Sequence, residues 1–513
     1  MLRKFAAIAG LLLLAACAGR VEPPGPPHRI ESHALPDPEK THLGQVFETA
    51  AERHPGLSGF DLITSGRTAF EARYAFARLA QKTIDAQYFL WAGDAVGRRM
   101  LEALLQAADR GVRVRLLLDD LNLIGSGLNL AVLNAHPNFE VRLFNPFDRR
   151  VFADLDLLLD FQRLNHRMHD KAFIVDNTIA IVGGRNMANA YFSVSGESNF
   201  RDIDVFAAGP VVRDISREFD TFWNSPWAVS IGDVTQARPN SEELKAAESK
   251  LRAETDDTKN FPFKTELDEP YLEHLAETVP DRLVWGKASV LYDEPNKPAT
   301  STPRVAEELR NKVAGTIRHR LLLEIAYFIP SEHGVERLCD LVRRGVRVRI
   351  LTNSLASTDE VAAYAGYMRI RKPLLRCGVE LHELRPDAAF VRRDWTWLRA
   401  SSEAELHTKA AVFDDDRVMI GSFNLDPRSR RINTEIAILI TSAPLAAKVA
   451  HFIEGGMSLA NSFLLEFPKG DDDVIWVAED KQHQLRFYHS PVTSWWRRFE
   501  SDFLSLLPIE DLL

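Results

Sequence analysis

Two short motifs carry the residue types needed for chemistry on a phosphate group. His169 is followed two residues later by Lys171, and His407 is followed at the same spacing by Lys409. An imidazole can attack phosphorus or transfer a proton, and a lysine ammonium can neutralise the non-bridging oxygens of a phosphodiester. The two motifs therefore predict in-line attack on a phosphodiester. One imidazole would form a covalent phosphoenzyme, and the other would protonate the departing alcohol.

The two motifs are copies of one internal repeat. Asp176 and Asp414 follow the two lysines at the same spacing, and the RGVRVR sequence at residues 110–115 recurs at residues 344–349. Such a repeat predicts two related halves, with one copy of each motif at their interface. Because side chains alternate along a strand, histidine and lysine share a face and the aspartate has the opposite parity. We therefore expect Asp176 and Asp414 to serve the turn or a salt bridge behind the site, without a catalytic role.

Small and polar residues follow the next predicted strand of each copy. The first copy has Gly184 and Asn186, and the second has Ser422 and Asn424. Glycine lets the backbone approach a ligand closely, and amide and hydroxyl groups donate hydrogen bonds. We expect these four residues to bind the phosphate.

A nucleophilic histidine also needs an acceptor that fixes the tautomer of its ring. Asp202 and Asp204 are the candidates for the first histidine, and Glu435 is the candidate for the second. We favour Asp202 and Glu435 because each directly precedes an apolar strand. Neither motif has a carboxylate or histidine partner at metal-ligand spacing, so we expect no metal and no other cofactor.

Alternating strand and helix patterns in both copies predict an α/β fold, built from two pseudo-symmetric α/β/α sandwich halves that pack face to face. We assign residues 41–228 to the first half and residues 276–465 to the second. Residues 229–275 form a charged connector, which we expect to be solvated, and residues 466–513 form a C-terminal tail.

The N-terminus resembles a bacterial lipoprotein signal. A basic start and an apolar run lead to small residues directly before Cys17, so residues 1–17 are read as a signal with Cys17 as the lipidated residue. The alternative is a plain signal peptide or an uncleaved anchor. The proline-rich residues 18–40 predict an extended tether. This arrangement predicts a membrane-attached lipoprotein of the cell envelope that faces the periplasm.

Composition excludes some classes of protein. Three cysteines among 513 residues are too few for a disulfide scaffold, and we expect Cys339 and Cys377 to pack in the core. The formal net charge of −9 argues against a dedicated DNA-binding protein.

The tail contains a tryptophan-rich segment. Trp495 and Trp496 are followed by Arg497, Arg498 and Phe499, a pattern that predicts an amphipathic helix at a membrane surface. A C-terminal helix docked on the core is an equally good interpretation.

The two intact HxKxxxxD motifs resemble those of the phospholipase D superfamily. The wider chain, over roughly residues 45–513, is similar to the bacterial cardiolipin synthase C branch, on segments that include residues 140–147, Val182–Asn186 and Ile420–Ser429. The resemblance implies paired phospholipase D-like halves, a phosphohistidine intermediate and no metal. It implies that His169 and His407 are the histidine pair, with His169 as nucleophile, that Lys171 and Lys409 bind phosphate, and that the two asparagines assist.

The same resemblance implies transfer of a phosphatidyl group to phosphatidylglycerol, which gives cardiolipin, with phosphatidylethanolamine as a further donor. Phospholipid substrates and the membrane surface are the expected partners, and neither a nucleic acid nor a protein partner is expected. Hydrolysis is the alternative, because water can also resolve the phosphoenzyme; its substrate would be a phospholipid or, less readily, a nucleic acid. A non-catalytic lipid-binding envelope protein is a third interpretation, which both intact motifs disfavour.

Overall fold

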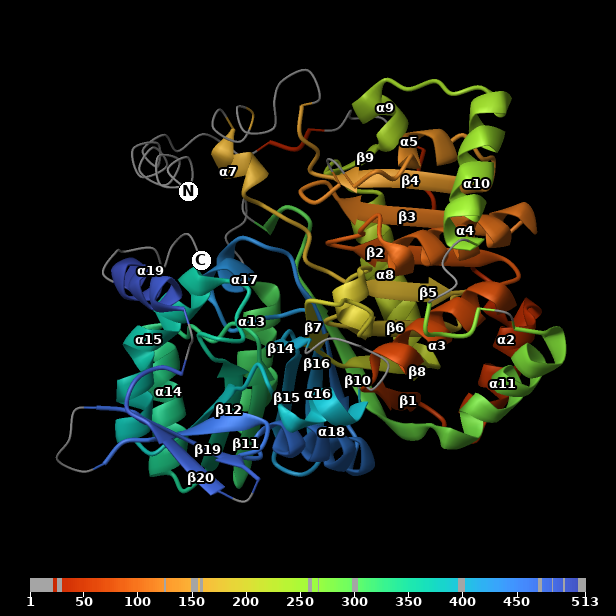
Figure 1. Cartoon of the computed structure of the whole chain (residues 1–513). Helices are drawn as coiled ribbons and strands as arrows, with labels where there is room; N and C mark the ends of the chain where they lie inside the picture. Colours follow the sequence, from red (N-terminus) through yellow and green to blue (C-terminus); the bar gives the residue numbers. More distant parts are fainter. Residues whose placement is uncertain are drawn as a thin grey trace.

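The chain folds into two α/β halves that share one order of elements (Figure 1). The predicted signal with Cys17 lies outside the part of the chain that the structure describes, and so does most of the predicted tether up to residue 29. The computed structural model describes residues 22–24, 30–123, 126–148, 156, 160–256, 261–265, 267–297, 303–394, 402–468, 473–481, 483–491 and 494–505.

The sheet of the first half has the strand order β9–β4–β3–β2–β5–β6–β8–β1. The strands β2, β3 and β4 are parallel, as the strand–helix–strand pattern predicts, and the other neighbours are antiparallel. The strands are β1 (Ser58–Ile63), β2 (Thr83–Tyr88), β3 (Arg113–Asp119), β4 (Phe139–Phe144), β5 (Ala172–Val175), β6 (Ile179–Gly183), β8 (Asp204–Ala208) and β9 (Ala228–Ser230).

The second sheet repeats this order as β18–β13–β12–β11–β15–β16–β17–β10. Two further strands, β19 and β20, extend it beyond β18, so the predicted tail continues the sheet. The strands are β10 (Val284–Tyr292), β11 (Arg320–Ile325), β12 (Arg347–Asn353), β13 (Glu380–Leu384), β15 (Lys409–Phe413), β16 (Arg417–Gly421), β17 (Ile436–Thr441), β18 (Ser462–Glu466), β19 (Ile475–Asp480) and β20 (His483–Phe487).

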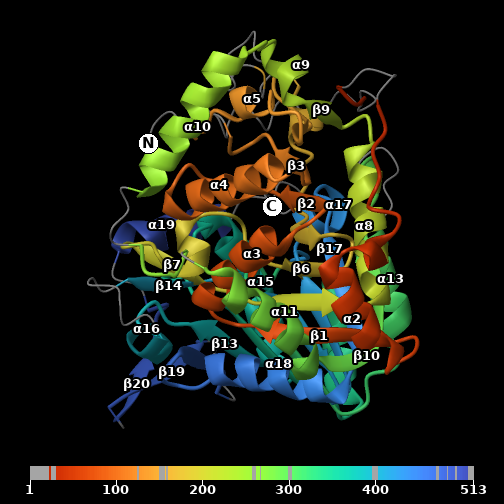
Figure 2. The ribbon, with the colours of Figure 1, turned by 90° about the vertical axis from the view of Figure 1, so that its right-hand side faces the viewer.

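The two sheets are joined edge to edge by β1 and β10, which pair antiparallel from Ser58 with Gly286 to Phe60 with Val284. Helices cover both faces of the joined sheet (Figure 2). One shared core lies under α8 (Pro210–Trp223) and α18 (Ala443–Gly456) and contains apolar residues of both halves. Separate cores on the other faces lie under α3 (Gly66–Leu79) and α4 (Ala95–Asp109), and under α14 (Glu332–Arg343) and α15 (Val361–Arg376). The expected pair of α/β/α halves is confirmed.

The connector packs against the first half more closely than its composition indicates. It forms α9 (Ile231–Thr235), α10 (Ser241–Asp256) and the start of α11 (Glu269–Arg282). Leu251 of α10 is buried in the core under α4, and the Arg99 guanidinium of α4 donates to the carbonyl of Thr255. These contacts add an outer layer to the first half.

The described end of the predicted tether is also held to the first half. The Ser32 amide donates to Asn224 Oδ1, and the Ala34 amide donates to Asp220 Oδ2 on α8. None of the helices in the described residues is both long and apolar enough to span a bilayer.

The expectation that Cys339 and Cys377 are simple packing residues is wrong. The two residues form a disulfide bond, with their Cα atoms 5.4 Å apart. Cys339 lies on α14, and Cys377 directly follows α15. The bond therefore joins two neighbouring helices on one face of the second sheet, a proximity that their distance in sequence does not reveal.

The aspartates of the two motifs hold equivalent turns. The Asp176 carboxylate accepts hydrogen bonds from the amides of Gln81, Lys82 and Thr83, which lead into β2. Asp414 accepts in the same way from the amides of residues 318–320, which lead into β11. Of the two predicted roles, both carboxylates have the turn role, and Asp414 also forms an ion pair with Arg417.

We expect Asp176→Asn to lower the free energy of unfolding by about 1–3 kcal/mol, because a buried carboxylate that accepts amide hydrogen bonds is replaced by a neutral group. Urea unfolding followed by circular dichroism measures the loss. Asp415→Asn is the control, since the Asp415 side chain is 73% exposed and its ion pair with Arg320 lies at the surface, where a pair contributes less than about 1 kcal/mol. Equal stability of the two variants would contradict the turn role.

Candidate active site

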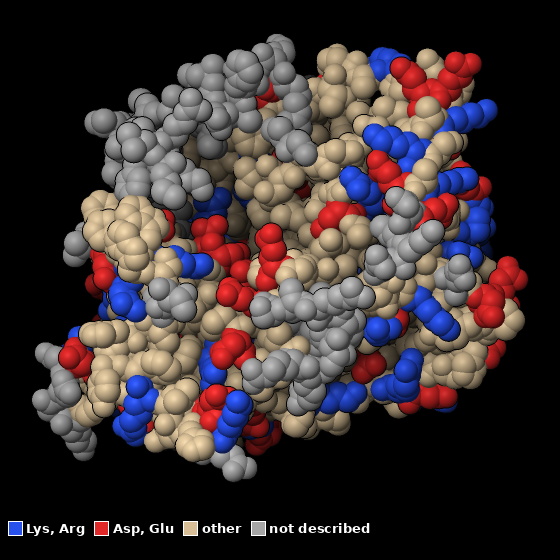
Figure 3. Space-filling model, viewed as in Figure 1, with Lys and Arg blue, Asp and Glu red and all other residues tan. Residues whose placement is uncertain are grey.

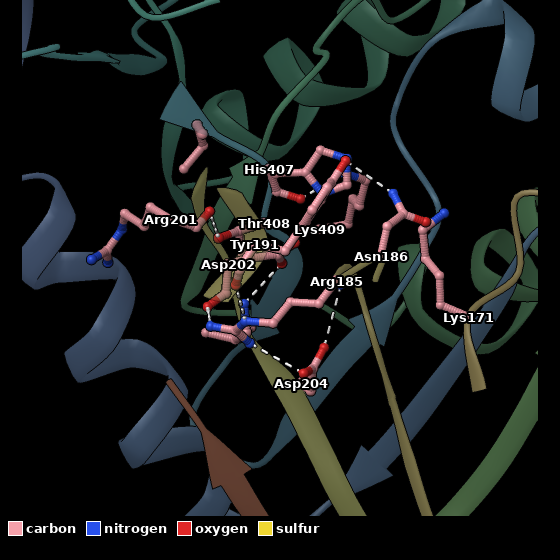
Figure 4. Close-up of polar contacts among 12 residues, drawn as sticks. Lys171, Arg185, Asn186, Tyr191, Arg201, Asp202, Asp204, His407, Thr408 and Lys409 are labelled. Atoms are coloured by element: carbon pink, nitrogen blue, oxygen red, sulfur yellow. Dashed lines mark hydrogen bonds and ion pairs between the residues drawn. The ribbon is translucent and has the colours of Figure 1, made fainter. Parts of the chain in front are cut away.

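The two histidine motifs lie where the halves meet. His169 and Lys171 lie in the residues just before β5, and His407 lies two residues before Lys409, the first residue of β15. All four side chains are buried. Each lysine Nζ donates to the backbone carbonyl of the histidine in its own motif. Figure 4 shows Lys171, Asn186 and Lys409 close to His407.

Each histidine is held by a carboxylate from the other half. His169 Nδ1 lies 2.9 Å from Glu435 Oε2, and His407 Nδ1 lies 2.8 Å from Asp202 Oδ2. The expectation that Asp202 orients the first histidine is therefore wrong: Asp202 holds the second histidine, and Glu435 holds the first. A carboxylate that accepts the Nδ1 proton leaves Nε2 as the nitrogen that can attack phosphorus or exchange a proton.

Backbone pairing across the interface explains this exchange of partners. The strand β7 (Ser198–Arg201), which ends directly before Asp202, pairs with β14 (Glu403–Leu406), which ends directly before His407. In the mirror arrangement the His169 amide donates to the carbonyl of Thr434, the residue before Glu435. The segment before each histidine thus runs beside the segment before the opposite carboxylate.

Asp204, the alternative to Asp202, has a different environment. Its carboxylate forms buried ion pairs with Arg73 of α3 and with Arg185, at 2.9 Å and 3.2 Å. Figure 4 shows Asp204 joined to Arg185, at the end of the labelled group away from His407. We infer that Asp204 stabilises the protein behind the site through these two ion pairs and contacts no reacting group.

Gly184 and Ser422 occupy equivalent positions behind the two carboxylates. A Cβ atom on Gly184 would collide with the Asp202 carboxylate, so only glycine leaves room for that side chain. The hydroxyl of Ser422 instead donates to Glu435 Oε2. The structure thus places both residues against the orienting carboxylates, whereas the sequence predicted contact with phosphate.

The two asparagines differ in their partners. Asn186 Nδ2 donates to the hydroxyl of Tyr191, and Asn186 Oδ1 accepts from the Leu90 amide. Asn424 is buried, and its Oδ1 has no hydrogen-bond partner among the described residues. Both amide atoms of Asn186 thus have hydrogen-bond partners within the protein.

Three aromatic residues whose ring contacts the sequence interpretation missed lie against the catalytic rings, and one of them, Phe200, has its centroid 5.1 Å from that of His407. Tyr191 lies edge-on to His407 with ring centroids 4.9 Å apart, and Phe89 lies edge-on to His169 at 5.2 Å. Both rings restrict the orientation of an imidazole. Phe89 belongs to a Tyr-Phe pair that recurs in the second half at residues 327–328, and this repeat was the available signal.

Burial and mutual charge set the protonation of the site. Burial, followed by the charges of the two lysines, lowers the pKa of His169 and of His407 well below the usual value. Burial raises the pKa of Asp202 and Glu435 to about 7. Burial lowers the pKa of Lys171 to about 7 and that of Lys409 to about 8. Both imidazoles are therefore neutral at pH 7, the form in which nitrogen is a nucleophile.

The surface is hollowed beside this site. Figure 3 shows a hollow on the face viewed, between the first-half strands β3 and β4 and the second-half helix α19 (Trp495–Ser505), with acidic side chains along its lower rim.

The fold and the paired histidine–lysine motifs define a phospholipase D-type enzyme with two halves. The family described as "Cardiolipin synthase, PLD-like domain" matches residues 76–223 and 315–455. The chain belongs to this family.

Relatives of the chain agree with that assignment. The chain is 39% identical to cardiolipin synthase C of Escherichia coli over 92% of this chain and 99% of that protein. It is 26% identical to cardiolipin synthase A of Pseudomonas putida over 79% of this chain and 69% of that protein. The crystal structure of phosphatidylserine synthase from Haemophilus influenzae has a similar fold, with a TM-score of 0.53 and 16% identity over 82% of this chain and 92% of that chain.

We expect Gly184→Ala to lower turnover by about 100-fold, because the added methyl group displaces Asp202 and misplaces His407, and a shift of about 1 Å in a catalytic group costs that much. Initial rates with a phosphodiester substrate measure the effect. Gly196→Ala is the matched control, since a Cβ there meets nothing within 4 Å. A Gly184→Ala enzyme as active as the control would show that Asp202 tolerates the shift.

Proposed function

We propose that the protein is a phosphatidyltransferase that makes cardiolipin from phosphatidylglycerol and a second phospholipid, with phosphatidylethanolamine as a candidate donor. The observation that carries the proposal is the pair of imidazoles at the interface, each held at Nδ1 by a buried carboxylate of the other half. Membership of the cardiolipin synthase family supports the choice of substrate.

In the first step His169 Nε2 attacks the phosphorus of the donor lipid. A bond forms between nitrogen and phosphorus, the bond from phosphorus to the headgroup oxygen breaks, and protonated His407 gives its proton to the departing alcohol. Both imidazoles are neutral in the free site. A bound phosphodiester adds a negative charge, which favours protonation of His407. Lys171, Lys409 and the amide of Asn424 stabilise the charge on the non-bridging oxygens.

In the second step the acceptor resolves the phosphatidyl-histidine. His407, now neutral, takes the proton from a headgroup hydroxyl of phosphatidylglycerol, whose oxygen attacks phosphorus. The nitrogen–phosphorus bond breaks, His169 is restored, and His407 is again protonated. Attack by water in place of the hydroxyl would give phosphatidic acid, so exclusion of water decides between transfer and hydrolysis.

We further propose that the protein is a cell-envelope lipoprotein, attached through Cys17, with its catalytic halves facing the periplasm. The signal-like sequence that ends at Cys17 supports attachment. The disulfide bond between Cys339 and Cys377 supports an oxidising compartment, because such bonds persist in the periplasm and are rare in the cytosol.

The proposed function is tested with detergent-solubilised protein and labelled phosphatidylglycerol, with and without phosphatidylethanolamine. Mass spectrometry identifies the products. Labelled cardiolipin supports the transferase, and a higher yield with phosphatidylethanolamine identifies that lipid as a donor. Phosphatidic acid as the sole product would identify a hydrolase, and cleavage of a nucleic acid in preference to lipid would overturn the lipid substrate.

We expect His169→Ala and His407→Ala each to lower transfer by more than about 1000-fold, because one removes the nucleophile and the other the proton donor. His333→Ala is the control, since this ring is exposed at the surface. Circular dichroism establishes that all three variants are folded.

A phosphodiester with a p-nitrophenyl leaving group assigns the two roles, since that group departs without protonation. We expect a covalent phosphoenzyme to accumulate in His407→Ala and to be missing in His169→Ala. The opposite pattern would make His407 the nucleophile.

We expect kcat/KM to fall as pH rises through about 7 to 8, where Lys171 and Lys409 lose their protons in the free enzyme. The sign follows from the charge: below these pKa values both ammonium groups can bind phosphate, and above them the site loses positive charge. Initial rates between pH 6 and 9 provide the profile. A flat profile would show that the lysines stay charged throughout.

A further inference from the structure

The final helix, α19, lies on α15 (Figure 1). Ser501 and Arg497 of this helix face the protein body. The hydroxyl of Ser501, which is buried, donates to Met368 Sδ on α15, and Arg369 Nε donates to the carbonyl of Ser505 at 2.8 Å. Arg497 donates to the carbonyl of Thr358. These contacts fix the orientation of the helix.

The aromatic residues of α19 point away from the body. Trp495 is 72% exposed and Phe499 is 51% exposed, and Trp496 and Phe503 are also exposed. Their rings form a continuous series, with centroids 5.5 Å apart from Trp495 to Trp496, 5.5 Å from Trp496 to Phe499 and 6.3 Å from Phe499 to Phe503. An ordinary docked helix buries its apolar face, whereas α19 exposes its aromatic face. Large side chains grouped in this way mark an interaction surface.

We propose that this aromatic face, formed by Trp495, Trp496, Phe499 and Phe503, docks the enzyme onto the surface of a phospholipid bilayer. Tryptophan and phenylalanine on a fixed helix suit the headgroup region, where aromatic rings enter the interface and the backbone remains satisfied within the helix. Of the two interpretations of this segment, the structure shows the helix docked on the body of the protein, and the membrane-binding face remains our proposal.

The aromatic face lies near the active site, which favours a lipid surface as its binding partner. Thr358, which accepts from Arg497, precedes Asp359, and Asp359 accepts from the Tyr327 hydroxyl at 2.8 Å. Arg497 also interacts electrostatically with Glu405, which lies on β14 two residues before His407. The docking helix thus contacts the segment at Thr358, and its Arg497 lies close enough to Glu405, on the strand that ends directly before His407, to interact with its charge.

Figure 3 shows the bulky uncharged surface at α19 directly beside the hollow. This inference rests on the proposed function, because a bilayer is the source of phospholipid headgroups. A bilayer held against the aromatic face would present headgroups to the hollow while the acyl chains stay in the lipid. The aromatic face would therefore determine how the active site is oriented toward the bilayer, which the histidines alone do not.

Insertion of the face is measured at a single labelled position. In a full chain carrying Cys17→Ser, the remaining cysteines are joined in the disulfide, so Phe499→Cys supplies the one free thiol for an environment-sensitive fluorophore. Vesicles of phosphatidylglycerol and phosphatidylethanolamine are added, with and without a lipid-attached quencher. We expect a blue shift and strong quenching. The matched control is Tyr271→Cys on α11, where Tyr271 is 48% exposed, and we expect neither change there.

Three results would overturn the proposal. These are no vesicle binding, vesicle binding without a spectral change at position 499, and equal changes at positions 499 and 271. A blue shift at position 499 without vesicles, together with a dimer mass in analytical ultracentrifugation, would assign the face to a second copy of the chain instead.

Transfer measured on two forms of the substrate tests membrane docking separately from the proposed transferase function. Alanine replacements at Trp495, Trp496, Phe499 and Phe503 together should lower transfer on vesicles at least tenfold more than transfer on monomeric short-chain phosphatidylglycerol. Tyr271→Ala should lower neither. Equal losses on both substrates would overturn docking, whereas fluorophore insertion in an enzyme without transferase activity would overturn the proposed function and leave docking intact.

Discussion

The site depends on two hydrogen bonds that cross the interface between the halves, from His169 to Glu435 and from His407 to Asp202. Each places a carboxylate, wholly buried, against a ring from the other half, and such a group is costly to bury without a partner. Neither half contains a complete histidine–carboxylate pair, so catalysis requires both. The edge pairing of β1 with β10 and the core under α8 and α18 keep the halves in the one arrangement that completes both pairs.

Much of the fold could be predicted from the sequence because the repeat carries it. The RGVRVR strands, the helices before them and the histidine motifs recur in order, and periodicity assigns each to an α/β layer. Strand parity predicted that Asp176 and Asp414 lie behind the site, in a turn or a salt bridge, and take no catalytic role. The two carboxylates that hold the histidines were also predictable, since residue type and position before an apolar strand identified Asp202 and Glu435.

Which carboxylate holds which histidine was not predictable. A repeat identifies equivalent residues, but whether Asp202 meets the histidine of its own half depends on which strands meet across the interface, here β7 with β14. The same limit explains the disulfide, because Cys339 and Cys377 become neighbours only when α14 and α15 pack side by side. The sequence interpretation assigned Gly184 and Ser422 to phosphate binding. It missed their contacts with the carboxylates because those contacts depend on side-chain packing, which the sequence does not show.

Exchange of carboxylates between equivalent halves reproduces, within one polypeptide, the symmetry of a twofold dimer whose subunits complete each other's sites. In a dimer of identical subunits both imidazoles would have the same surroundings by necessity. Fusion into one chain removes that constraint and lets the surroundings diverge, as Gly184 behind one acid and Ser422 behind the other already have. A gene duplication of this kind allows one ring to specialise as nucleophile and the other as proton carrier.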